Sequence, residues 1–259
     1  MGIDIDVKDR VVMITGGARG IGLSIAKAFL EHGACIHLVD LDPTGEPIDQ
    51  LHCSGSLYVH RGDVTIPVSI QACVDEIVNT SGRIDILVNC AGVIYKDLVE
   101  NLDVAAWQRV MDINVTGTML AARAVVPIMK EKRWGRIINI SSMQALMGTP
   151  QYSAYTASKA AVIGLTRVWA MELVSYNITV NDLCPSFVRT PLLERAVEAL
   201  GKTEGISLEA AKERFVGLVP QRRFLEPEEI AFATLFLSSE WARGITGSSI
   251  AIAAGCVLY

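Results

Sequence analysis

The stretch Thr15-Gly16-Gly17-Ala18-Arg19-Gly20-Ile21-Gly22 follows a short apolar run, Val11–Ile14, and leads into a segment of helical spacing that ends at Glu31. It predicts a strand, a glycine-rich turn and a helix. Glycines let the backbone turn tightly and approach a pyrophosphate, which then binds the free N–H groups at the start of the helix. We expect a nucleotide phosphate site whose residues include Gly16, Arg19, Gly20, Ile21 and Gly22.

The glycine spacing alone fits two classes of nucleotide site. Gly17 and Gly22 have the separation found in phosphate-loop ATPases, but Leu23 stands where those proteins need a lysine, so nucleotide hydrolysis is disfavoured. A dinucleotide site needs an acidic residue about 20 residues after the turn, and Asp40 meets this requirement at the end of the second strand. Its carboxylate can accept both ribose hydroxyls of NAD and would repel the 2′-phosphate of NADP. Arg19 is the opposing feature, since a base beside the loop favours NADP. We give Asp40 the greater weight and expect NAD as the cofactor.

Strand-like and helix-like segments alternate along the rest of the chain. Strands are expected at Ile- and Val-rich runs that barely alternate in polarity, as in strands buried on both faces: Val11–Thr15, Cys35–Val39, Leu57–Val59, Ile84–Val88, Arg136–Ile140, Ile178–Leu183 and Ser248–Ala253. Candidate helices are Gly20–Glu31, Val68–Thr80, Trp107–Lys132, Ser153–Val174 and Pro227–Leu237. The alternation predicts an α/β fold, a doubly wound parallel sheet (Rossmann fold) of about seven strands with helices on both faces, in a single domain over residues 1–259.

The composition limits the class of protein. The 259 residues are 51% hydrophobic, enough for a packed core, and 28 acidic against 23 basic side chains give a net charge of −5. An acidic balance disfavours nucleic-acid binding, which needs a basic face. The sequence has no apolar run of the ~18 residues that cross a bilayer, no signal-peptide pattern at its start, and six scattered cysteines without a C-x-x-C pair. We expect a cytoplasmic protein acting on small molecules, without nucleic-acid or membrane partners.

One segment interrupts the alternation. About forty residues separate the sixth strand from the helix at Pro227, with a charged helical pattern at Leu208–Phe215 and with Gly201 and Gly205 as caps or hinges. We expect the insertion at about 190–220 to form a mobile substrate lid, in which Leu192, Leu193, Val197 and Phe215 cover the substrate. The alternative is a solvated surface excursion.

A second group of residues carries acid–base chemistry. Tyr155 and Lys159 are four residues apart in a helical segment, so they share one face. A nearby ammonium favours the phenolate form of tyrosine, which makes the pair a plausible acid/base near neutrality. Ser142 comes directly after the fifth strand, which places its hydroxyl at the carboxyl edge of the sheet, where α/β proteins bind ligands.

Together these residues resemble the short-chain dehydrogenase/reductase family, and the resemblance covers nearly the whole chain. The motifs occur in the family's order: the T-G-x-x-x-G-x-G loop at Thr15–Gly22, Asp63-Val64, Asn89-Cys90-Ala91-Gly92, Asn114, Ser142, Y-x-A-S-K at Tyr155–Lys159, and Pro185 with Thr190 after the sixth strand. The resemblance implies an oxidoreductase that interconverts a secondary alcohol and a ketone.

The resemblance also implies roles for individual residues. Tyr155 would exchange a proton with the substrate oxygen, Ser142 would hydrogen-bond that oxygen, Lys159 would lower the tyrosine pKa and hold the nicotinamide ribose, and Asn114 would anchor a water. Further cofactor contacts would come from Asp63 and Val64 at the adenine, from Asn89, Ala91 and Gly92 at the adenosine and ribose, and from Val188 and Thr190 at the nicotinamide amide.

The chain departs from the family pattern at three places. Cys90 replaces the second Asn of N-N-A-G, Ser186 replaces the Gly that follows Pro185, and Ile252-Ala253-Ala254-Gly255 replaces V-D-G-G. The second change makes the backbone beside the nicotinamide less permissive, and the third leaves the C-terminal packing open. Each of the catalytic residues is retained.

Other classes of function are weighed against this one. The sequence contains neither H-E-x-x-H nor G-x-S-x-G, so metal and serine hydrolases are disfavoured and we expect no metal. The four histidines, at positions 32, 37, 52 and 60, are expected at the surface or at helix ends. Two alternatives stay open: an NADPH-dependent carbonyl or 3-oxoacyl reductase, and a dinucleotide-binding regulator without activity. The family resemblance implies a homotetramer formed through the helices at Trp107–Lys132 and Ser153–Val174.

The substrate is not specified by the motifs. We expect Tyr95, Gln144 and Tyr152 to line its pocket together with Ser142 and Tyr155. The segment Thr190–Arg195 resembles 3-hydroxybutyrate dehydrogenases, yet Tyr152 and Gln144 stand where Lys and His are expected in those enzymes. Hydroxy acids, polyols, sugars and cyclic alcohols all remain candidate substrates.

Overall fold

The structure, a computed structural model, describes residues 5–44 and 55–257. Within these ranges, one seven-stranded parallel sheet has the order β3-β2-β1-β4-β5-β6-β7. The predicted doubly wound α/β sheet is confirmed, and each strand overlaps its predicted range. The strands are β1 (Val11–Thr15), β2 (Cys35–Asp40), β3 (Leu57–Arg61), β4 (Ile86–Asn89), β5 (Gly135–Ile140), β6 (Ile178–Pro185) and β7 (Ser249–Ile252).

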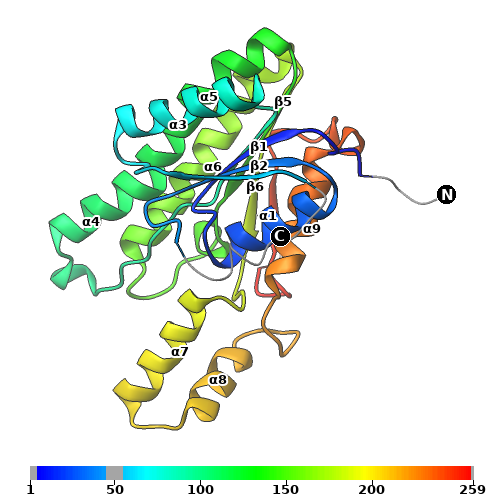
Figure 1. Ribbon diagram of the computed structural model, residues 1–259. Helices are drawn as coiled ribbons and strands as arrows, with labels where there is room; N and C mark the ends of the chain where they lie inside the picture. Colours follow the sequence, from blue (N-terminus) through cyan, green and yellow to red (C-terminus); the bar gives the residue numbers. More distant parts are fainter. Residues whose placement is uncertain (1–4, 45–54, 258–259) are drawn as a thin grey trace.

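Helices cover both faces of the sheet (Figure 1). On one face α1 (Gly20–Glu31) packs against α9 (Pro227–Ser238), and the other carries α3 (Pro67–Ser81), α5 (Gly117–Lys132) and α6 (Ser153–Leu173), with α4 (Val104–Met111) against α6. Short 3-10 turns are η1 (Val99–Asn101), η3 (Met143–Ala145), η4 (Val174–Tyr176) and η5 (Glu240–Ala242). In the described part of the chain, every helix is too short or too polar to cross a membrane.

Alternate residues of each strand face the two helical layers. In β1, Val12 and Ile14 belong to the apolar cluster that includes α1 and α9, whereas Val11 and Met13 belong to the cluster of α3, α5 and α6. None of the four is more than 4% exposed. Burial on both faces explains why the strand sequences barely alternate in polarity.

The strand order reverses between β1 and β4. At such a switch point the loops that follow the two strands run in opposite directions and leave a crevice at the carboxyl edge of the sheet. The glycine-rich turn follows β1 and residues 90–92 follow β4, so both border this crevice.

One predicted helix is interrupted. Instead of a single helix over Trp107–Lys132, the chain is helical from Val104 and contains a π-helical turn, η2 (Asp112–Thr116), between α4 and α5. Inside this turn the Asn114 carbonyl accepts a hydrogen bond from the Thr118 hydroxyl at 2.9 Å. Such turns add one residue to the helix and frequently occur at functional sites.

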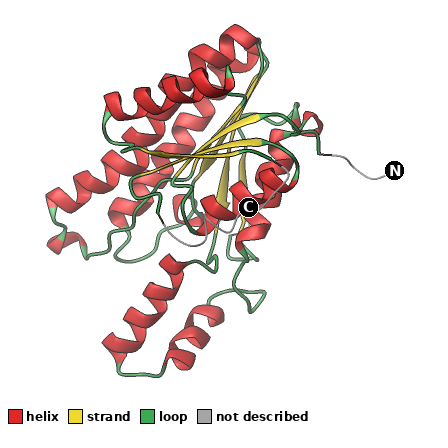
Figure 2. Cartoon of the chain, in the orientation of Figure 1, coloured by secondary structure: helices red, strands yellow, loops and turns green. Residues whose placement is uncertain are grey.

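The insertion after β6 forms two helices, α7 (Pro191–Glu204) and α8 (Leu208–Gly217), which pack on each other beyond the carboxyl edge of the sheet (Figure 2). The helix predicted at Leu208–Phe215 is confirmed, but α7 was not predicted. Gly205 ends α7 in a left-handed conformation with φ +65° and is therefore a cap. Gly201 lies buried inside α7, so its interpretation as a hinge is wrong.

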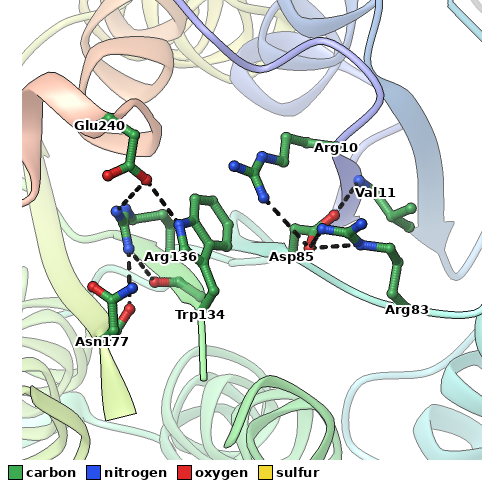
Figure 3. Close-up of polar contacts among 9 residues, drawn as sticks. Arg10, Val11, Arg83, Asp85, Trp134, Arg136, Asn177 and Glu240 are labelled. Carbon is green, nitrogen blue, oxygen red and sulfur yellow. Dashed lines mark hydrogen bonds and ion pairs between the residues drawn. The ribbon is translucent and has the colours of Figure 1, made fainter. Parts of the chain in front are cut away.

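Charged residues form a row along the amino-terminal edge of the sheet, opposite the crevice (Figure 3). The Trp134 ring lies between the guanidinium groups of Arg10 and Arg136, which are 3.8 and 4.4 Å from its centroid. Arg136 is 0% exposed and donates to the Glu240 carboxylate at 3.1 Å, while Arg10 also approaches Asp85 at 4.0 Å. Because buried charges are stable only when paired, this row fixes the starts of β1, β4 and β5 relative to η5, far from the crevice.

A buried histidine lies in the middle of β2. His37 is 0% exposed, its Nδ1 is 2.9 Å from Nε2 of His60, its Nε2 is 2.8 Å from Oγ of Ser81, and its ring stacks on Tyr58. His60 in turn contacts the Glu76 carboxylate at 2.9 Å. Burial, followed by the neighbouring His60, lowers the pKa of His37 to about 4. The predicted surface position is therefore wrong for His37; His32 does cap the end of α1, and His52 lies outside the described residues.

This histidine makes the fold sensitive to acid. Unfolded His37 takes up a proton near pH 6.5, whereas the folded chain keeps it neutral down to about pH 4. Its contribution to the free energy of unfolding is therefore complete above pH 6.5 and is lost as the pH falls towards 4, on the order of 2–3 kcal/mol. Urea unfolding of His37→Gln should show a weaker pH dependence than the wild type, and His32→Gln should not. Equal pH slopes for the wild type and His37→Gln would contradict this account.

Candidate active site

The glycine-rich turn packs closely against itself and against the loop after β4. Gly16 has φ +67°, and a Cβ there would lie 2.7 Å from the Cα of Ala91. A Cβ at Gly22 would lie 2.3 Å from the Gly16 carbonyl oxygen. The Thr15 hydroxyl accepts the N–H of Cys90 at 3.3 Å and ties the turn to the end of β4. The two loops that border the crevice are thus held in contact by backbone that leaves no room for side chains.

The start of α1 offers unpaired donors to this crevice. Arg19 precedes the first turn without a side-chain cap, and the turn contains no acidic residue. The N–H groups at a helix start carry partial positive charge and bind phosphate. Gly20, with φ +55°, approaches Thr190, so the loop after β6 closes the other side. The residues present fit the pyrophosphate of a dinucleotide.

Asp40 lies at the end of β2, as predicted. Its Oδ2 accepts the Ala18 N–H and its Oδ1 accepts the Asp42 N–H, both at 3.2 Å. The Arg19 guanidinium is 3.8 Å away and its side chain is 57% exposed. Backbone donors therefore hold the Asp40 carboxylate at the crevice. It lies beside Arg19, the residue whose charge favours NADP.

Three other predicted cofactor residues border the crevice with side chains already engaged. Asp63 accepts the N–H and hydroxyl of Thr65 through Oδ1, at 2.8 and 2.7 Å. Val64 packs against Gly117 of α5. Asn89 is buried and its Nδ2 donates to Asn139 at 2.9 Å, while its Oδ1 has no partner among the described residues.

A cavity of about 440 Å³ brings the predicted catalytic groups together. Ser142, Tyr155 and Lys159 all line it, and so do four predicted cofactor residues: Ile21, Gly92, Val188 and Thr190. Ser142 follows β5, and Tyr155 and Lys159 lie one turn apart on α6. Three side chains from two separate parts of the chain thus line one space beside the glycine-rich turn.

Lys159 is held in the wall of this cavity by a backbone carbonyl. It is 5% exposed and donates to the Ile140 carbonyl at 2.7 Å, with Nζ 5.8 Å from the centroid of the Tyr155 ring. Burial lowers the pKa of Lys159 to about 8. Burial also raises the pKa of Tyr155 to about 12, although the Ser142 side chain acts in the opposite direction. In the chain alone the phenol is therefore the main form of Tyr155 at neutral pH.

Asn114 lies beside this pair because of the π-helical turn. Its Nδ2 donates to the Val93 carbonyl at 3.0 Å and to the Ser158 hydroxyl at 2.9 Å, while its Oδ1 accepts the Val93 N–H at 2.9 Å. A Cβ at Gly92 would lie 3.4 Å from both Asn114 Oδ1 and Lys159 Nζ. Asn114 thus fixes the loop after β4 at the point where that loop meets Lys159.

The cavity brings together most, but not all, of the predicted substrate residues. Gln144 and Tyr152 line the cavity with Ser142 and Tyr155, but Tyr95 does not. Its hydroxyl donates to Asp97 at 3.2 Å and accepts the Asp103 N–H at 3.0 Å, outside the cavity. The next residue, Lys96, lines the cavity instead and was missed, because side chains of adjacent residues in an extended segment point in opposite directions.

Residues of the insertion also reach this cavity. Leu192, Leu193 and Phe215 line it as predicted, together with Arg195, whereas Val197 is buried between α7 and α8. The Cys90 thiol lines it too, and burial raises its pKa to about 11, so this cysteine stays neutral. Among residues 5–44 and 55–257, no three His, Cys, Asp or Glu side chains are grouped to hold a metal ion.

The other two departures from the family pattern are accommodated. The backbone at Ser186 lies outside the left-handed region, so the position does not require glycine. Ala254 has φ +50°, and its carbonyl accepts the Gln221 N–H at 3.2 Å. The C-terminal segment is therefore held against the end of the insertion in spite of its unusual sequence.

Comparisons with known proteins agree with this arrangement. A family model described as enoyl-(acyl carrier protein) reductase matches residues 16–257. The D-beta-hydroxybutyrate dehydrogenase of Rhizobium meliloti is 34% identical over 252 residues, covering 95% of this chain and 98% of that protein. The D-threitol dehydrogenase of Mycolicibacterium smegmatis is 36% identical over 260 residues, with coverages of 98% and 96%. The crystal structure of NAD⁺-bound xylitol dehydrogenase has a TM-score of 0.89 at 31% identity, with coverages of 96% and 100%.

The match to the family model spans nearly the whole chain, and these relatives are of nearly the same length. The chain therefore belongs to the short-chain dehydrogenase/reductase family and is an oxidoreductase that acts on the CH–OH group of alcohols or on the corresponding ketones.

Proposed function

We propose that the protein is an NAD-dependent dehydrogenase that interconverts a secondary alcohol and a ketone, with Tyr155 as the acid/base. One observation carries the proposal: Ser142, Tyr155 and Lys159 line one cavity next to the glycine-rich turn. When bound, the dinucleotide accepts or donates the hydride. Gly16, Arg19, Gly20, Ile21 and Gly22 would hold its pyrophosphate, Asp40 its adenosine ribose, and Val188 and Thr190 its nicotinamide end.

The chain's own residues manage the proton. In ketone reduction the Tyr155 hydroxyl donates a proton to the carbonyl oxygen, and in alcohol oxidation the phenolate takes it back. The Ser142 hydroxyl donates to the same oxygen and stabilises the charge that develops on it. Lys159, held by the Ile140 carbonyl, places a positive charge behind the tyrosine and favours its phenolate. Asn114 holds the loop after β4 beside Lys159, where it would anchor a water that links the lysine to solvent.

Cofactor choice follows from Asp40. A carboxylate fixed by two backbone N–H groups can accept ribose hydroxyls, whereas the 2′-phosphate of NADP would meet a like charge there. We expect kcat/KM with NAD to exceed that with NADP by about 10-fold or more, which corresponds to about 1.4 kcal/mol. Asp40→Ser should reduce this ratio, and Asp42→Ser, which removes an exposed carboxylate two residues away, should not.

Two alternatives are tested by the same assay. The exposed Arg19 beside the loop supports an NADPH-dependent carbonyl or 3-oxoacyl reductase, which would show equal or better kcat/KM with NADP. A regulator without activity would bind NAD and yet form no reduced cofactor with any secondary alcohol. The absorbance of reduced cofactor, followed with a panel of secondary alcohols, separates the three.

We also propose a homotetramer in the cytoplasm. Two helices present large apolar side chains to solvent: Val168 and Met171 on α6 are 55% and 80% exposed, and Phe232 and Phe236 on α9 are 58% and 42% exposed. Exposed apolar groups of this kind mark contact surfaces, and the tetramer is the expectation from the family. The cysteines of the described chain are free, which suits a reducing compartment. Light scattering of the purified protein measures the assembly.

A further inference from the structure

The charges around the cavity all have one sign. Lys96, Lys159 and Arg195 line it, and among the described residues on its wall none is acidic. Lys159 is committed to the Ile140 carbonyl. The other two cations have no role in the proton chemistry, and their effect is to make the cavity attractive to an anion.

Lys96 is positioned above the reacting groups by aromatic rings. Its ammonium lies 4.6 Å from the centroid of the Tyr152 ring, and that ring packs edge-on against Tyr155 with centroids 6.3 Å apart. The segment of Lys96 is fixed by the Asp97 N–H, which donates to the Gln151 carbonyl at 3.0 Å. The Tyr152 ring therefore contacts both the Lys96 ammonium and the Tyr155 ring.

Lys96 and Arg195 are the two cations on the cavity wall that remain for a ligand, among the residues that the structure describes. No carboxylate in the described ranges forms an ion pair with Lys96 or Arg195. The neighbouring Asp97 is turned the other way, where it accepts the Tyr95 hydroxyl and the Leu98 N–H. Arg195 uses its Nε within α7, on the Pro191 carbonyl at 3.1 Å. Lys96 is thus the cation with all its donors available beside the reacting groups.

A buried amide supplies a second group for a ligand. Gln144 is 6% exposed and lines the same cavity, and its side-chain oxygen has no hydrogen-bond partner among the described residues. A buried amide without partners is costly, and its two ends can be exchanged by rotation to offer a donor or an acceptor. A polar ligand in the cavity would supply the partner that the Gln144 side-chain oxygen lacks.

We propose that the substrate is a small hydroxy acid or keto acid, whose carboxylate is held by Lys96 with the Gln144 amide as its hydrogen-bond partner. This inference rests on the proposed function and names its substrate class. The carboxylate would sit over Tyr152 while the carbinol carbon lies at Tyr155. The cavity of about 440 Å³ must also admit the nicotinamide end of the cofactor, which keeps the acid small.

The test compares substrates that differ only in charge. We would measure kcat/KM with NAD for 2-, 3- and 4-hydroxypentanoate, and compare each acid with its own methyl ester. For the preferred isomer, we expect kcat/KM for the acid to exceed that for the ester by about 10-fold or more. Added salt should raise KM for the acid and leave that for the ester unchanged, because it screens the attraction to an exposed ammonium.

A matched pair of variants assigns the effect to one lysine. Lys96→Met keeps the apolar stem over the Tyr152 ring and removes the charge, so it should lower kcat/KM for the acid about 10-fold, through KM, and spare the ester. Lys130→Met is the control, because Lys130 makes the same contact with Tyr176, also at 4.6 Å, on another part of the surface. Binding of the keto acid 3-oxopentanoate can also be measured by calorimetry in the absence of cofactor. Lys96→Met should raise its dissociation constant, and Lys130→Met should not.

Several outcomes would overturn the inference. This role for Lys96 would be excluded if the enzyme turned over the ester as well as the acid. It would also be excluded if Lys96→Met lowered kcat/KM equally for the acid and the ester. The third contrary result is a preference for the acid that Arg195→Gln removes and Lys96→Met keeps. The failure of the proposed function has a different signature: no reduced cofactor forms with acids, esters or neutral secondary alcohols, although NAD binds.

Discussion

Tyr155→Phe should lower kcat/KM by about 100-fold or more in both directions, the usual scale of general acid–base catalysis. The substitution removes the hydroxyl that exchanges the proton and leaves the ring, which packs against Tyr152, in place. The glycine-rich turn and Asp40 are untouched, so the dissociation constant for NAD should change little. Steady-state kinetics and calorimetry with NAD measure the two effects separately.

The control for this variant is Tyr176→Phe. It removes the same hydroxyl from a tyrosine that contacts Lys130 and Arg133, and that does not line the cavity. Its kinetics should match those of the wild type. If Tyr155→Phe kept most of the activity, the proton would have to come from another group.

The wild-type pH profile gives an independent view of the same residue. Because burial raises the pKa of Tyr155 to about 12, the phenolate is the minor form at neutral pH in the chain alone. Alcohol oxidation needs the phenolate and should accelerate as the pH rises, whereas ketone reduction needs the phenol and should not. Parallel profiles for the two directions would exclude Tyr155 as the group that titrates.

Lys159→Met should have the second largest effect. Methionine has a similar volume but cannot donate to the Ile140 carbonyl and places no charge beside Tyr155. We expect kcat/KM to fall by about 100-fold and the dissociation constant for NAD to rise as well, since the lysine serves both the proton and the ribose. This combined loss distinguishes it from Tyr155→Phe, which should affect turnover alone.

An exposed lysine provides the control for Lys159→Met. Lys132 lies in the last turn of α5, away from the cavity, so Lys132→Met should keep both activity and NAD affinity. Thermal unfolding of Lys159→Met verifies that the fold is intact. A variant that lost turnover but bound NAD like the wild type would confine Lys159 to the proton chemistry.

The fold and the catalytic core were accessible from the sequence because their signals are local. The turn after β1 needs glycine at Gly16 and Gly22, where any side chain would collide with backbone. Tyr155 and Lys159 share a helix face because of their spacing, and Ser142 follows a strand that is buried on both faces. Each of these constraints acts within a few residues, so the order of the residues alone shows it.

Features that depend on distant contacts were missed. Which of Tyr95 and Lys96 faces the cavity is decided by pairing of their segment with residues 151–152, and the sequence shows no periodicity there. The π-helical turn at Asn114 adds one residue to an otherwise regular apolar pattern. The burial of His37 depends on His60 and Ser81, which come from other elements.

One missed element did carry a local signal. α7 begins with Thr190 followed by Pro191, a capping residue and a proline at the first helical position, and it ends at Gly205. These start and stop signals were overlooked because the segment was expected to form a mobile lid. Gly201 and Gly205 were interpreted as caps or hinges, and Gly205 is the cap that ends α7.

The central claim is that hydride passes between a carbinol carbon and NAD at the cavity of Tyr155. The most direct measurement uses the best substrate of the panel carrying deuterium on its carbinol carbon, with mass spectrometry of the cofactor after the reaction. We expect one deuterium in the reduced NAD from the wild type, and almost none in the same time from Tyr155→Phe. Reduced NAD without deuterium, or equal labelling by both proteins, would contradict the account.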